Sequence, residues 1–504
     1  MAPLIDRIAG RRVPEHQGAP RVIVDEDGWR LISGALAAGH CTLLGLWGDT
    51  RIVHMAVLDQ RAVLVVSLPC AAGRFPSVAA SHPPAVRLER AIRSLFGLEP
   101  AGLPDPRPWL DLGFWGVAHP LGAGAAATAS ITPYAFLPTE GEGLHQIPVG
   151  PVHAGIIEPG HFRFTANGET VVRLEARLGY VHKGIELLMA GATLDKAFRL
   201  AGRTSGDSTV AYALAFAQAV ERAWSVQVPA RAIHLRALMA ELERVANHLG
   251  DIGAICNDAS FSLMHAQCGI LRELTLRAAD ACFGHRLMMD AVVPGGVALD
   301  LPATGGKTIL SLLAQIKQIF PKLIELYDNT ASLQDRTAAT GTLPAALARQ
   351  FGAGGCIGRA SGRAFDARRT PGYAPYDMLE FDIPVLEDGD VNSRVWLRIR
   401  ELEQSLRLIE QIVRHLPAGS IRNELSQPSG TREGLREGLG LVEGFRGDVL
   451  VWLRTDGARV ARCHLRDPSW FQWPLLEAVI EGNIVADFPL CNKSFNCSYS
   501  GHDL

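Results

Sequence analysis

Runs of branched apolar residues, separated by polar or glycine turns, mark the first 70 positions of the chain. The segments RVIVD, CTLLGLW, RIVHMAVL and RAVLVVSL, within residues 20–70, have the composition of short β-strands. A stretch with helical spacing follows from Pro84 to Phe96. We therefore predict a small α/β domain at residues 1–116.

The pattern changes after this domain. Residues 117–147 contain the run LGAGAAATAS and have too little periodic apolar surface for a core element, which predicts a linker. The predicted second domain, residues 148–504, opens with HFRFTANGETVVRLEAR. Here Asn167-Gly168 stands between two alternating runs and predicts a hairpin turn.

From Thr193 to Leu416 the apolar residues recur mostly with a spacing of 3.6. One broad apolar face includes Leu238, Leu242 and Leu249, with Pro229 near the predicted first turn. The pattern predicts long helices at 193–224, 229–256, 262–289, 307–327 and 393–416. Such helices indicate a bundle, so the predicted fold class is α+β: a small α/β domain, then a helix bundle with peripheral β-strands.

Composition narrows the class of protein. The 504 residues, 48% of them apolar, suffice for two or more domains with sizeable cores. A net charge of −3 provides no basic field for nucleic acid. No uninterrupted apolar run reaches the roughly 18–20 residues of a membrane span, so membrane association is expected only through partners. The nine cysteines form no C-x-x-C pair, and we expect free thiols.

Two short segments carry candidate chemistry. Residues 203–208 read Arg-Thr-Ser-Gly-Asp-Ser, and residues 495–500 read Phe-Asn-Cys-Ser-Tyr-Ser. The first resembles the R-x-C-G-x-C motif of [NiFe]-hydrogenase large subunits with serine at both cysteine positions. The second resembles their D-P-C-x-x-C motif with only the first cysteine kept.

The resemblance extends over the whole chain. GEGLHQIPVGPVHAGIIEPGHFRF (141–164) resembles the group 4, energy-converting branch, which includes formate hydrogenlyase and hydrogenase-4. LGYVHKGIELL (178–188), VPARAIHLRALMAELERVANHL (228–249), RASGRAFDAR (359–368) and PSWFQWPLLEAVIEGNIVADF (468–488) are also similar to the 49 kDa subunit of complex I. VRLERAIRSLFGLEPAGLPDPRPWL (86–110) resembles its 30 kDa subunit. Fusion of these two domains is itself typical of the group 4 family.

The resemblance implies that Ser205, Ser208, Cys497 and Ser500 occupy the four metal-ligand positions of the family. Soft thiolates hold nickel and iron there, and a protonated hydroxyl cannot replace them. We therefore expect no metal on this chain and no NiFe centre. Ser205 and Ser208 could keep a polar role at a redox site, or they could be helix caps or packing groups. Cys497 could be a small buried apolar side chain rather than a ligand.

Three further residues are candidates for catalysis by resemblance. His153 matches the histidine at the quinone headgroup of complex I, and Glu186 matches an acidic residue of proton movement, with His182 and Lys183 able to modulate its charge. Arg203 matches the arginine of R-x-C-G-x-C and stands where the quinone-site tyrosine is expected. For His153 the alternative is a purely structural role in a loop. For Glu186 the alternative is an ion pair with His182 on the surface of a helix.

Arg359, Asp366 and Arg368, within RASGRAFDAR, are candidates for an internal charge network. Such networks position or stabilise as often as they catalyse.

The resemblance implies a large-subunit homologue of a membrane-associated respiratory complex similar to NADH:quinone oxidoreductase or hydrogenase-4. The chain would take part in electron transfer coupled to ion translocation, with a quinone as candidate acceptor, without hydrogenase chemistry and without an NADH site of its own. The implied partners are an iron-sulfur small subunit and membrane antiporter-like and anchor subunits. They would hold the chain peripherally at the cytoplasmic face of the inner membrane.

Two alternative functions remain at this point. One is a non-redox structural or coupling subunit, in which the Leu238, Leu242 and Leu249 face would serve assembly. The other is an active [NiFe] hydrogenase. Because only Asp503 and Leu504 follow His502, we expect no maturation protease to act on the tail.

Overall fold

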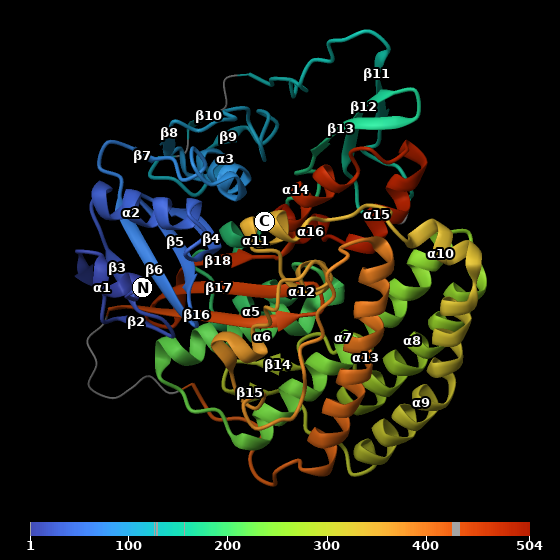
Figure 1. Ribbon diagram of the computed structural model, residues 1–504. Helices are drawn as coiled ribbons and strands as arrows, with labels where there is room; N and C mark the ends of the chain where they lie inside the picture. Colours follow the sequence, from blue (N-terminus) through green and yellow to red (C-terminus); the bar gives the residue numbers. More distant parts are fainter. Residues whose placement is uncertain (1, 125, 128–129, 156, 426–433) are drawn as a thin grey trace.

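A sheet with two helices forms the N-terminal part of the chain (Figure 1). The computed structural model describes residues 2–124, 126–127, 130–155, 157–425 and 434–504. The sheet has the order β1-β3-β6-β5-β4, in which β3 and β6 are parallel and β4, β5 and β6 form antiparallel pairs. Its members are β1 (Arg11–Arg12), β3 (Arg21–Ile23), β4 (Thr42–Asp49), β5 (Ile52–Asp59) and β6 (Ala62–Pro69), with helices α2 (Glu26–Ala37) and α3 (Val86–Phe96). The predicted small α/β unit is confirmed.

Short elements complete this part of the chain and the segment after it. They are α1 (Leu4–Arg7), β2 (His16–Gln17), β7 (Arg74–Pro76), the 3-10 turn η1 (Pro83–Ala85), β8 (Glu99–Ala101), β9 (Val117–Ala118) and β10 (Ala126–Ala127). Part of the Ala/Gly run of the predicted linker, residues 125 and 128–129, lies outside the described residues.

A three-stranded sheet follows: β11 (Leu144–Val149), β12 (His161–Asn167) and β13 (Thr170–Arg177). The hairpin predicted at Asn167-Gly168 is confirmed, because β12 ends at Asn167 and Asn167 pairs with Thr170. Gly168 takes a left-handed conformation with φ +57°, which glycine adopts without steric cost. The strand β11 begins inside the predicted linker. Its own sequence does not predict a strand, and its backbone pairs with β12.

Long helices lie side by side in the second half of the chain (Figure 1). Four of the predicted helices are confirmed as α7 (Ala230–Asp258), α8 (Ser262–Phe283), α9 (Gly305–Asn329) and α13 (Val391–Arg414). The fifth, predicted over 193–224, is wrong as one helix: α5 (Leu194–Gly202) and α6 (Thr209–Trp224) are separated by residues 203–208. That break holds the candidate ligand positions.

The remaining elements are short, except for three long strands. They are α4 (Ile185–Met189), η2 (Gly206–Ser208), β14 (Val292–Val293), β15 (Gly296–Val297), α10 (Ala331–Thr337), α11 (Ala345–Gln350), α12 (Gly355–Arg359), η3 (Arg368–Gly372), β16 (Leu435–Gly444), β17 (Gly447–Asp456), β18 (Arg459–Arg466), α14 (Ser469–Val479), η4 (Val485–Asp487), α15 (Phe488–Phe495) and α16 (Tyr499–His502).

The sheet β18-β17-β16-β2 lies between α6 and the N-terminal sheet. One side packs on α6, and a buried cluster that includes Trp47 and Trp452 joins β17 to the N-terminal sheet. The glycine-rich sequence of β16 hides this strand from prediction, yet the glycines are required there. A Cβ on Gly438 or Gly440 would lie 2.0 Å from a carbonyl oxygen of α6, so only glycine lets the helix approach.

The apolar face of α7 is not a surface. Leu238, Leu242 and Leu249 have an exposed fraction of 0%, so the expectation that this face serves assembly is wrong. The helix is buried on nearly all sides between α6, α8 and α13. Among the described residues, no helix combines the length and apolar character needed to cross a membrane.

Candidate functional site

The two segments that carry the candidate ligand positions meet in the fold. Ser498 Oγ donates to Ser205 Oγ at 3.2 Å and lies 3.5 Å from Ser500 Oγ. The segment before α6 and the C-terminal segment therefore form one polar cluster from residues that are far apart in the sequence.

An ion pair lies at the centre of this cluster. Arg446, in the turn between β16 and β17, donates to both carboxylate oxygens of Asp207, at 2.8 and 2.5 Å, and to Ser208 Oγ at 3.0 Å. It also donates to the carbonyl of Asn496 at 2.5 Å. Burial alone would raise the pKa of Asp207, but the guanidinium outweighs it and lowers the pKa to about 2. Arg446 thus ties the two segments together through a permanent charge pair.

Neither serine caps a helix through its side chain, so the capping alternative is wrong, while the alternative of buried packing groups still stands. Ser205 and Ser208 both donate to Asp207 Oδ1, at 2.7 and 3.3 Å. Glu243 of α7 caps α6 instead, accepting from the backbone N–H of Val210 at 2.7 Å. Burial raises the pKa of Glu243 to about 8.

The single remaining thiol is buried. Cys497 is 6% exposed, and its Sγ lies 4.0 Å from Gln472 Oε1. Burial raises the pKa of this thiol well above its usual range. These surroundings are those of a small packed side chain.

The loop before β12 folds onto the C-terminal segment. His153 Nε2 lies 3.4 Å from Tyr499 Oη, and the His153 ring packs edge-on against Phe162. Glu158 accepts from the backbone N–H of Ser500 at 3.0 Å. Partial burial lowers the pKa of His153 and so favours its neutral imidazole. The sequence pattern did not single out Tyr499, although it stands within the C-terminal motif.

Glu186 is a buried, ion-paired carboxylate. It lies 2.8 Å from Arg462 Nη1 and 2.9 Å from His464 Nδ1, both on β18. Burial would raise its pKa, but the Arg462 guanidinium, together with the bonds from His464 and the backbone N–H of Leu465, outweighs burial and lowers the pKa to about 2. His182 and Lys183 do not bond this carboxylate: they bond the carbonyls of Asp503 and of residues 203–204, and an influence of their charge on Glu186 stays a prediction.

Replacing Glu186 with Gln is expected to reduce stability by about 3–5 kcal/mol at pH 7, because Arg462 is left buried without its counter-charge. The stabilisation from a lowered carboxyl pKa is fully present above pH 4.5 and is lost as pH falls toward 2. Thermal unfolding of the purified protein as a function of pH measures both effects. The exposed Glu140→Gln is the control, and equal behaviour of the two variants would contradict the ion-pair assignment.

Arg203 faces away from the other candidates. Its guanidinium forms a two-pronged pair with Asp290 at 2.5 and 2.7 Å, and its side chain is 41% exposed. His153, Glu186 and Arg203 therefore contact three different sets of neighbours. Near Glu186, the Lys183 side chain reaches the Arg203 backbone, with its Nζ donating to the Arg203 carbonyl at 3.1 Å.

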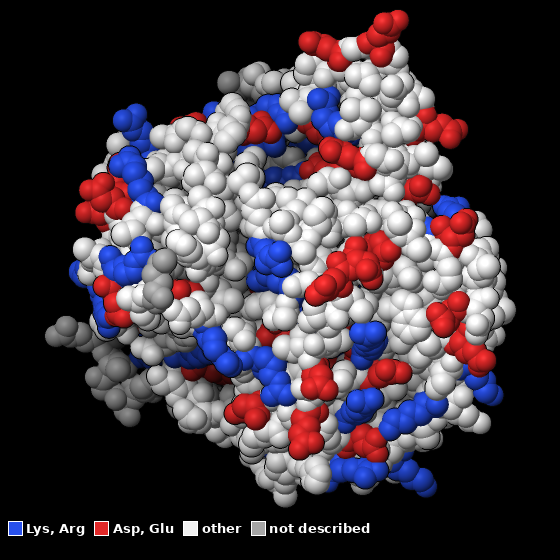
Figure 2. Space-filling view, viewed as in Figure 1, with Lys and Arg blue, Asp and Glu red and all other residues white. Residues whose placement is uncertain are grey.

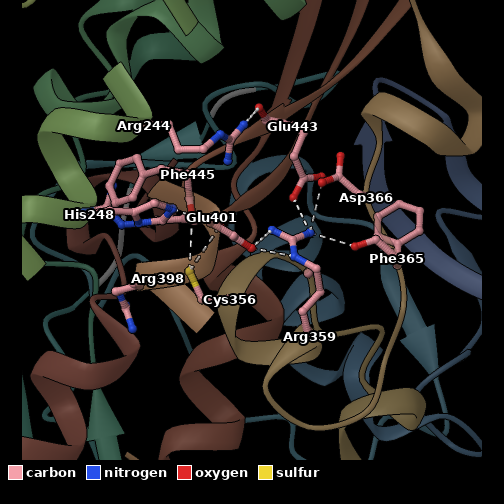
Figure 3. Close-up of polar contacts among 12 residues, drawn as sticks. Arg244, His248, Cys356, Arg359, Phe365, Asp366, Arg398, Glu401, Glu443 and Phe445 are labelled. Carbon is pink, nitrogen blue, oxygen red and sulfur yellow. Dashed lines mark hydrogen bonds and ion pairs between the residues drawn. The ribbon is translucent and has the colours of Figure 1, made fainter. Parts of the chain in front are cut away.

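Arg359, Asp366 and Arg368 lie in one buried network of charges. Figure 3 shows Arg359 and Asp366 beside Glu401 and Glu443. Arg359 lies 2.7 Å from Glu401, 2.8 Å from Glu443 and 3.5 Å from Asp366. Burial and the Asp366 carboxylate raise the pKa of Glu443. The network continues through further side chains: Arg368 to Asp366 and Glu241, and Arg244 to Glu241.

The network contains a trio of metal-binding residue types. The ligand atoms of His248, Cys356 and Glu401 lie within 4.8 Å of one another. His248 Nε2 is 2.8 Å from Glu401 Oε2, and the other carboxylate oxygen is held by Arg359. Burial raises the pKa of Cys356 to about 12. Both oxygens of Glu401 are thus engaged, while His248 Nδ1 has no hydrogen-bond partner among the described residues. The Arg359 guanidinium beside the trio disfavours a cation there.

The sequence did contain a signal for these residues. Glu241, Arg244 and His248 repeat at the spacing of one helical face inside an otherwise apolar stretch. Charges on a buried helix face need partners, which the fold supplies from α13 and β16.

A pocket of about 510 Å³ lies beside Glu186, which is one of its lining residues. It is lined by Trp115, Val117, Leu121, Lys183, Leu187 and Leu504, among others. The pocket lies where the segment after α3, the start of α4 and the C-terminal residue meet.

Comparison with known proteins agrees with the two-part organisation of the chain. Residues 48–128 match the family of the 30 Kd subunit of respiratory-chain NADH dehydrogenase, and residues 260–432 match that of its 49 Kd subunit. Formate hydrogenlyase subunit 5 of Escherichia coli is 31% identical over 440 residues, covering 85% of this chain and 77% of the relative. Hydrogenase-4 component G of the same organism is 30% identical, covering 92% and 82%. A subunit of the NADH-quinone oxidoreductase of Dehalococcoides mccartyi is 32% identical, covering 67% and 92%. The chain therefore belongs to the protein family that joins these hydrogenase and NADH-quinone oxidoreductase subunits, in the form that fuses the 30 Kd-like and 49 Kd-like domains.

Proposed function

We propose that this chain is the large subunit of a membrane-associated respiratory complex and takes part in electron transfer without hydrogenase chemistry. The observation that carries the proposal is the Asp207–Arg446 ion pair between the two candidate ligand segments. A carboxylate and a guanidinium occupy the position between Ser205, Ser208 and the C-terminal serines.

The residues present do not fit a NiFe centre. Its metals need several thiolates, whereas this cluster offers hydroxyls and one thiol, on Cys497, whose pKa is raised by burial. The carboxylate that contacts both Ser205 and Ser208, that of Asp207, is neutralised by Arg446. No metal-dependent step is therefore part of the proposal.

His153 and Tyr499 support a quinone as the acceptor. A neutral imidazole and a phenol, 3.4 Å apart, offer two hydrogen-bonding groups to a carbonyl oxygen. In this proposal the electrons come from an iron-sulfur cluster on a small subunit. Antiporter-like and anchor subunits move the ion and hold the chain at the cytoplasmic face of the membrane.

The purified complex is expected to contain only substoichiometric nickel and to neither evolve nor consume hydrogen. Elemental analysis, electron paramagnetic resonance and hydrogen-dependent dye reduction test this expectation. Formate hydrogenlyase, isolated and assayed in parallel, is the positive control. Near-equimolar nickel together with hydrogen-dependent dye reduction would overturn the proposal.

A further inference from the structure

A small pocket lies between the C-terminal half of α6, the start of α7 and the segment after η3. Its volume is about 160 Å³. The residues that matter for its chemistry are Leu214, Gln218, Arg222, Ile233, Tyr373 and Tyr376. His153, Tyr499 and the serines of the polar cluster are not among its lining residues, so the pocket is separate from the candidate site.

Two tyrosines form a fixed wall of this pocket. Tyr376 is fully buried, and its Oη donates to Glu241 at 2.7 Å. Tyr373 Oη accepts from the backbone N–H of Glu443 at 3.2 Å. Both rings are thereby tied to the buried charge network around Arg359. The pocket is therefore preformed, as small-molecule sites usually are.

Arg222 brings a positive charge to the pocket that lacks a carboxylate of its own. Its Nη1 donates to the carbonyl of Leu439 at 2.5 Å. Its Nε and Nη2 have no hydrogen-bond partner among the described residues, and neither atom is shut off from solvent. A ligand in the pocket can therefore reach this guanidinium.

The acid whose charge acts on Arg222 is already engaged elsewhere. Glu221 attracts Arg222, but burial outweighs that attraction and lowers the pKa of Arg222. The Glu221 carboxylate pairs with Arg236 at 2.5 Å and also accepts from the backbone N–H of Gly295 at 2.8 Å. These two guanidinium groups and one carboxylate leave a surplus positive charge, which favours an anion in the pocket.

Gln218 adds a second unsatisfied group beside Arg222. It is the single polar side chain in the run ALAFAQAV (213–220) and stands one helical turn before Arg222, so both side chains lie on one face of α6. Its amide has no hydrogen-bond partner among the described residues. The Oε1 atom is buried, whereas Nε2 is accessible and can donate to a ligand. Arg222 and Gln218 thus offer neighbouring donors to one acceptor group.

The remaining walls and the size of the pocket limit the ligand further. Leu214, Val228, Ile233 and Pro375 are apolar. A volume of about 160 Å³ holds about five or six non-hydrogen atoms, at roughly 30 Å³ for each water-sized group. Across the lower part of Figure 2, acidic and basic side chains are interspersed. One strong surface field is therefore not expected to select the ligand there, and the groups of the pocket itself decide.

We propose that this pocket binds a short-chain monocarboxylate, an organic anion of about four carbon atoms. Its carboxylate accepts from the Arg222 guanidinium and from Gln218 Nε2, and its alkyl chain lies against Leu214 and Ile233. An inorganic anion would match the charge but leave the apolar walls unfilled. A neutral molecule of the same shape would leave Arg222 without a counter-charge.

The site goes beyond the proposed electron-transfer role. The candidate residues of that role do not line the pocket, and its tests measure ligand binding rather than turnover. The two proposals can therefore fail separately.

The first test uses the purified wild-type complex, with sodium butyrate as the probe. Phenylglyoxal modifies accessible guanidinium groups, and peptide mass spectrometry measures the modified fraction of Arg222. Butyrate at about nine times its dissociation constant should slow this modification about tenfold, because about a tenth of the sites stay free. Butyramide, an uncharged analogue of the same shape, should give no protection.

Arg74 is the internal control in the same samples, because it is exposed on β7 and does not line the pocket. Its rate of modification should be equal with and without butyrate. Equal rates for Arg222 with and without butyrate would overturn the proposal. An Arg222 that phenylglyoxal never modifies would do so as well, since the pocket would then be closed to solutes.

The second test measures butyrate binding to variant complexes by isothermal titration calorimetry. Arg222→Met should bind at least about tenfold more weakly, the effect of losing a hydrogen bond to a charged group, and Gln218→Leu about fivefold more weakly. Arg74→Met should bind as the wild type does. If the Arg222→Met complex does not assemble, Gln218→Leu and the protection experiment decide. Wild-type affinity in Arg222→Met or in Gln218→Leu would contradict the site, and displacement of butyrate by an equal concentration of inorganic phosphate would contradict its selectivity for carboxylates.

Discussion

Replacing Arg359 with Met is expected to cost about 3–5 kcal/mol of unfolding free energy, because removing one partner from a buried ion pair leaves charge uncompensated. Arg359 is fully buried and holds the carboxylates of Glu401, Glu443 and Asp366 at 2.7–3.5 Å. It also donates to the carbonyl of Phe365 at 2.7 Å. No other guanidinium among its described neighbours contacts both Glu401 and Glu443.

Thermal and urea unfolding of the purified complex measure this effect. Arg363→Met is the matched control, because Arg363 lies on the same segment and donates to the carbonyl of Ala353 rather than to a carboxylate. Its loss should cost about 1 kcal/mol. Arg359→Lys keeps the positive charge but lacks the planar set of guanidinium donors, so its loss of unfolding free energy should lie between those of the two Met variants. An Arg359→Met protein as stable as the control would mean that the network does not hold the bundle together.

The long periodic segments were predictable because their signal is local. An amphipathic stretch such as 307–327 contains its whole spacing pattern, and α9 extends it only slightly, to Gly305–Asn329. The same rule failed over 193–224. The apolar positions there continue in helical phase across Ser205 and Ser208, but Glu243 from another helix fixes the start of α6.

The central sheet was missed for a related reason. Gly438 and Gly440 depress the strand signal of β16, and their purpose is a close approach of α6 that a sequence window does not contain. Contacts between distant segments cannot be read from spacing alone. The meeting of Ser205 with Ser498, and of Glu186 with Arg462 and His464, needed the fold.

The candidate site was partly predictable. The family motifs identified the two segments that meet, but they did not identify Arg446, which no motif contains. They also grouped Arg203 with His153, whereas Arg203 pairs with Asp290 on another surface. Resemblance locates a segment, while the side chain's partner depends on the surrounding residues of this particular chain.

His153→Ala and Tyr499→Phe are each expected to lower quinone-dependent turnover of the complex on the order of a hundredfold, the effect of removing one hydrogen-bond donor from a site of developing charge. Both should leave assembly intact. His153 lies in a loop and is only partly buried, and Tyr499→Phe removes one hydroxyl while the ring keeps its contact with Trp473. The expected loss of stability is therefore about 1 kcal/mol.

The assay is turnover of the reconstituted complex with a soluble quinone, beside its yield in size-exclusion chromatography. The exposed His145→Ala on β11 is the matched control, while Glu186→Gln is unsuitable because its loss breaks a buried ion pair. A redox role predicts slow but fully assembled complexes for both His153→Ala and Tyr499→Phe, since each removes the hydrogen-bonding pair at 3.4 Å. If both variants turn over at the rate of His145→Ala, the electron-transfer role of this pair is wrong and the chain acts as a structural or coupling subunit.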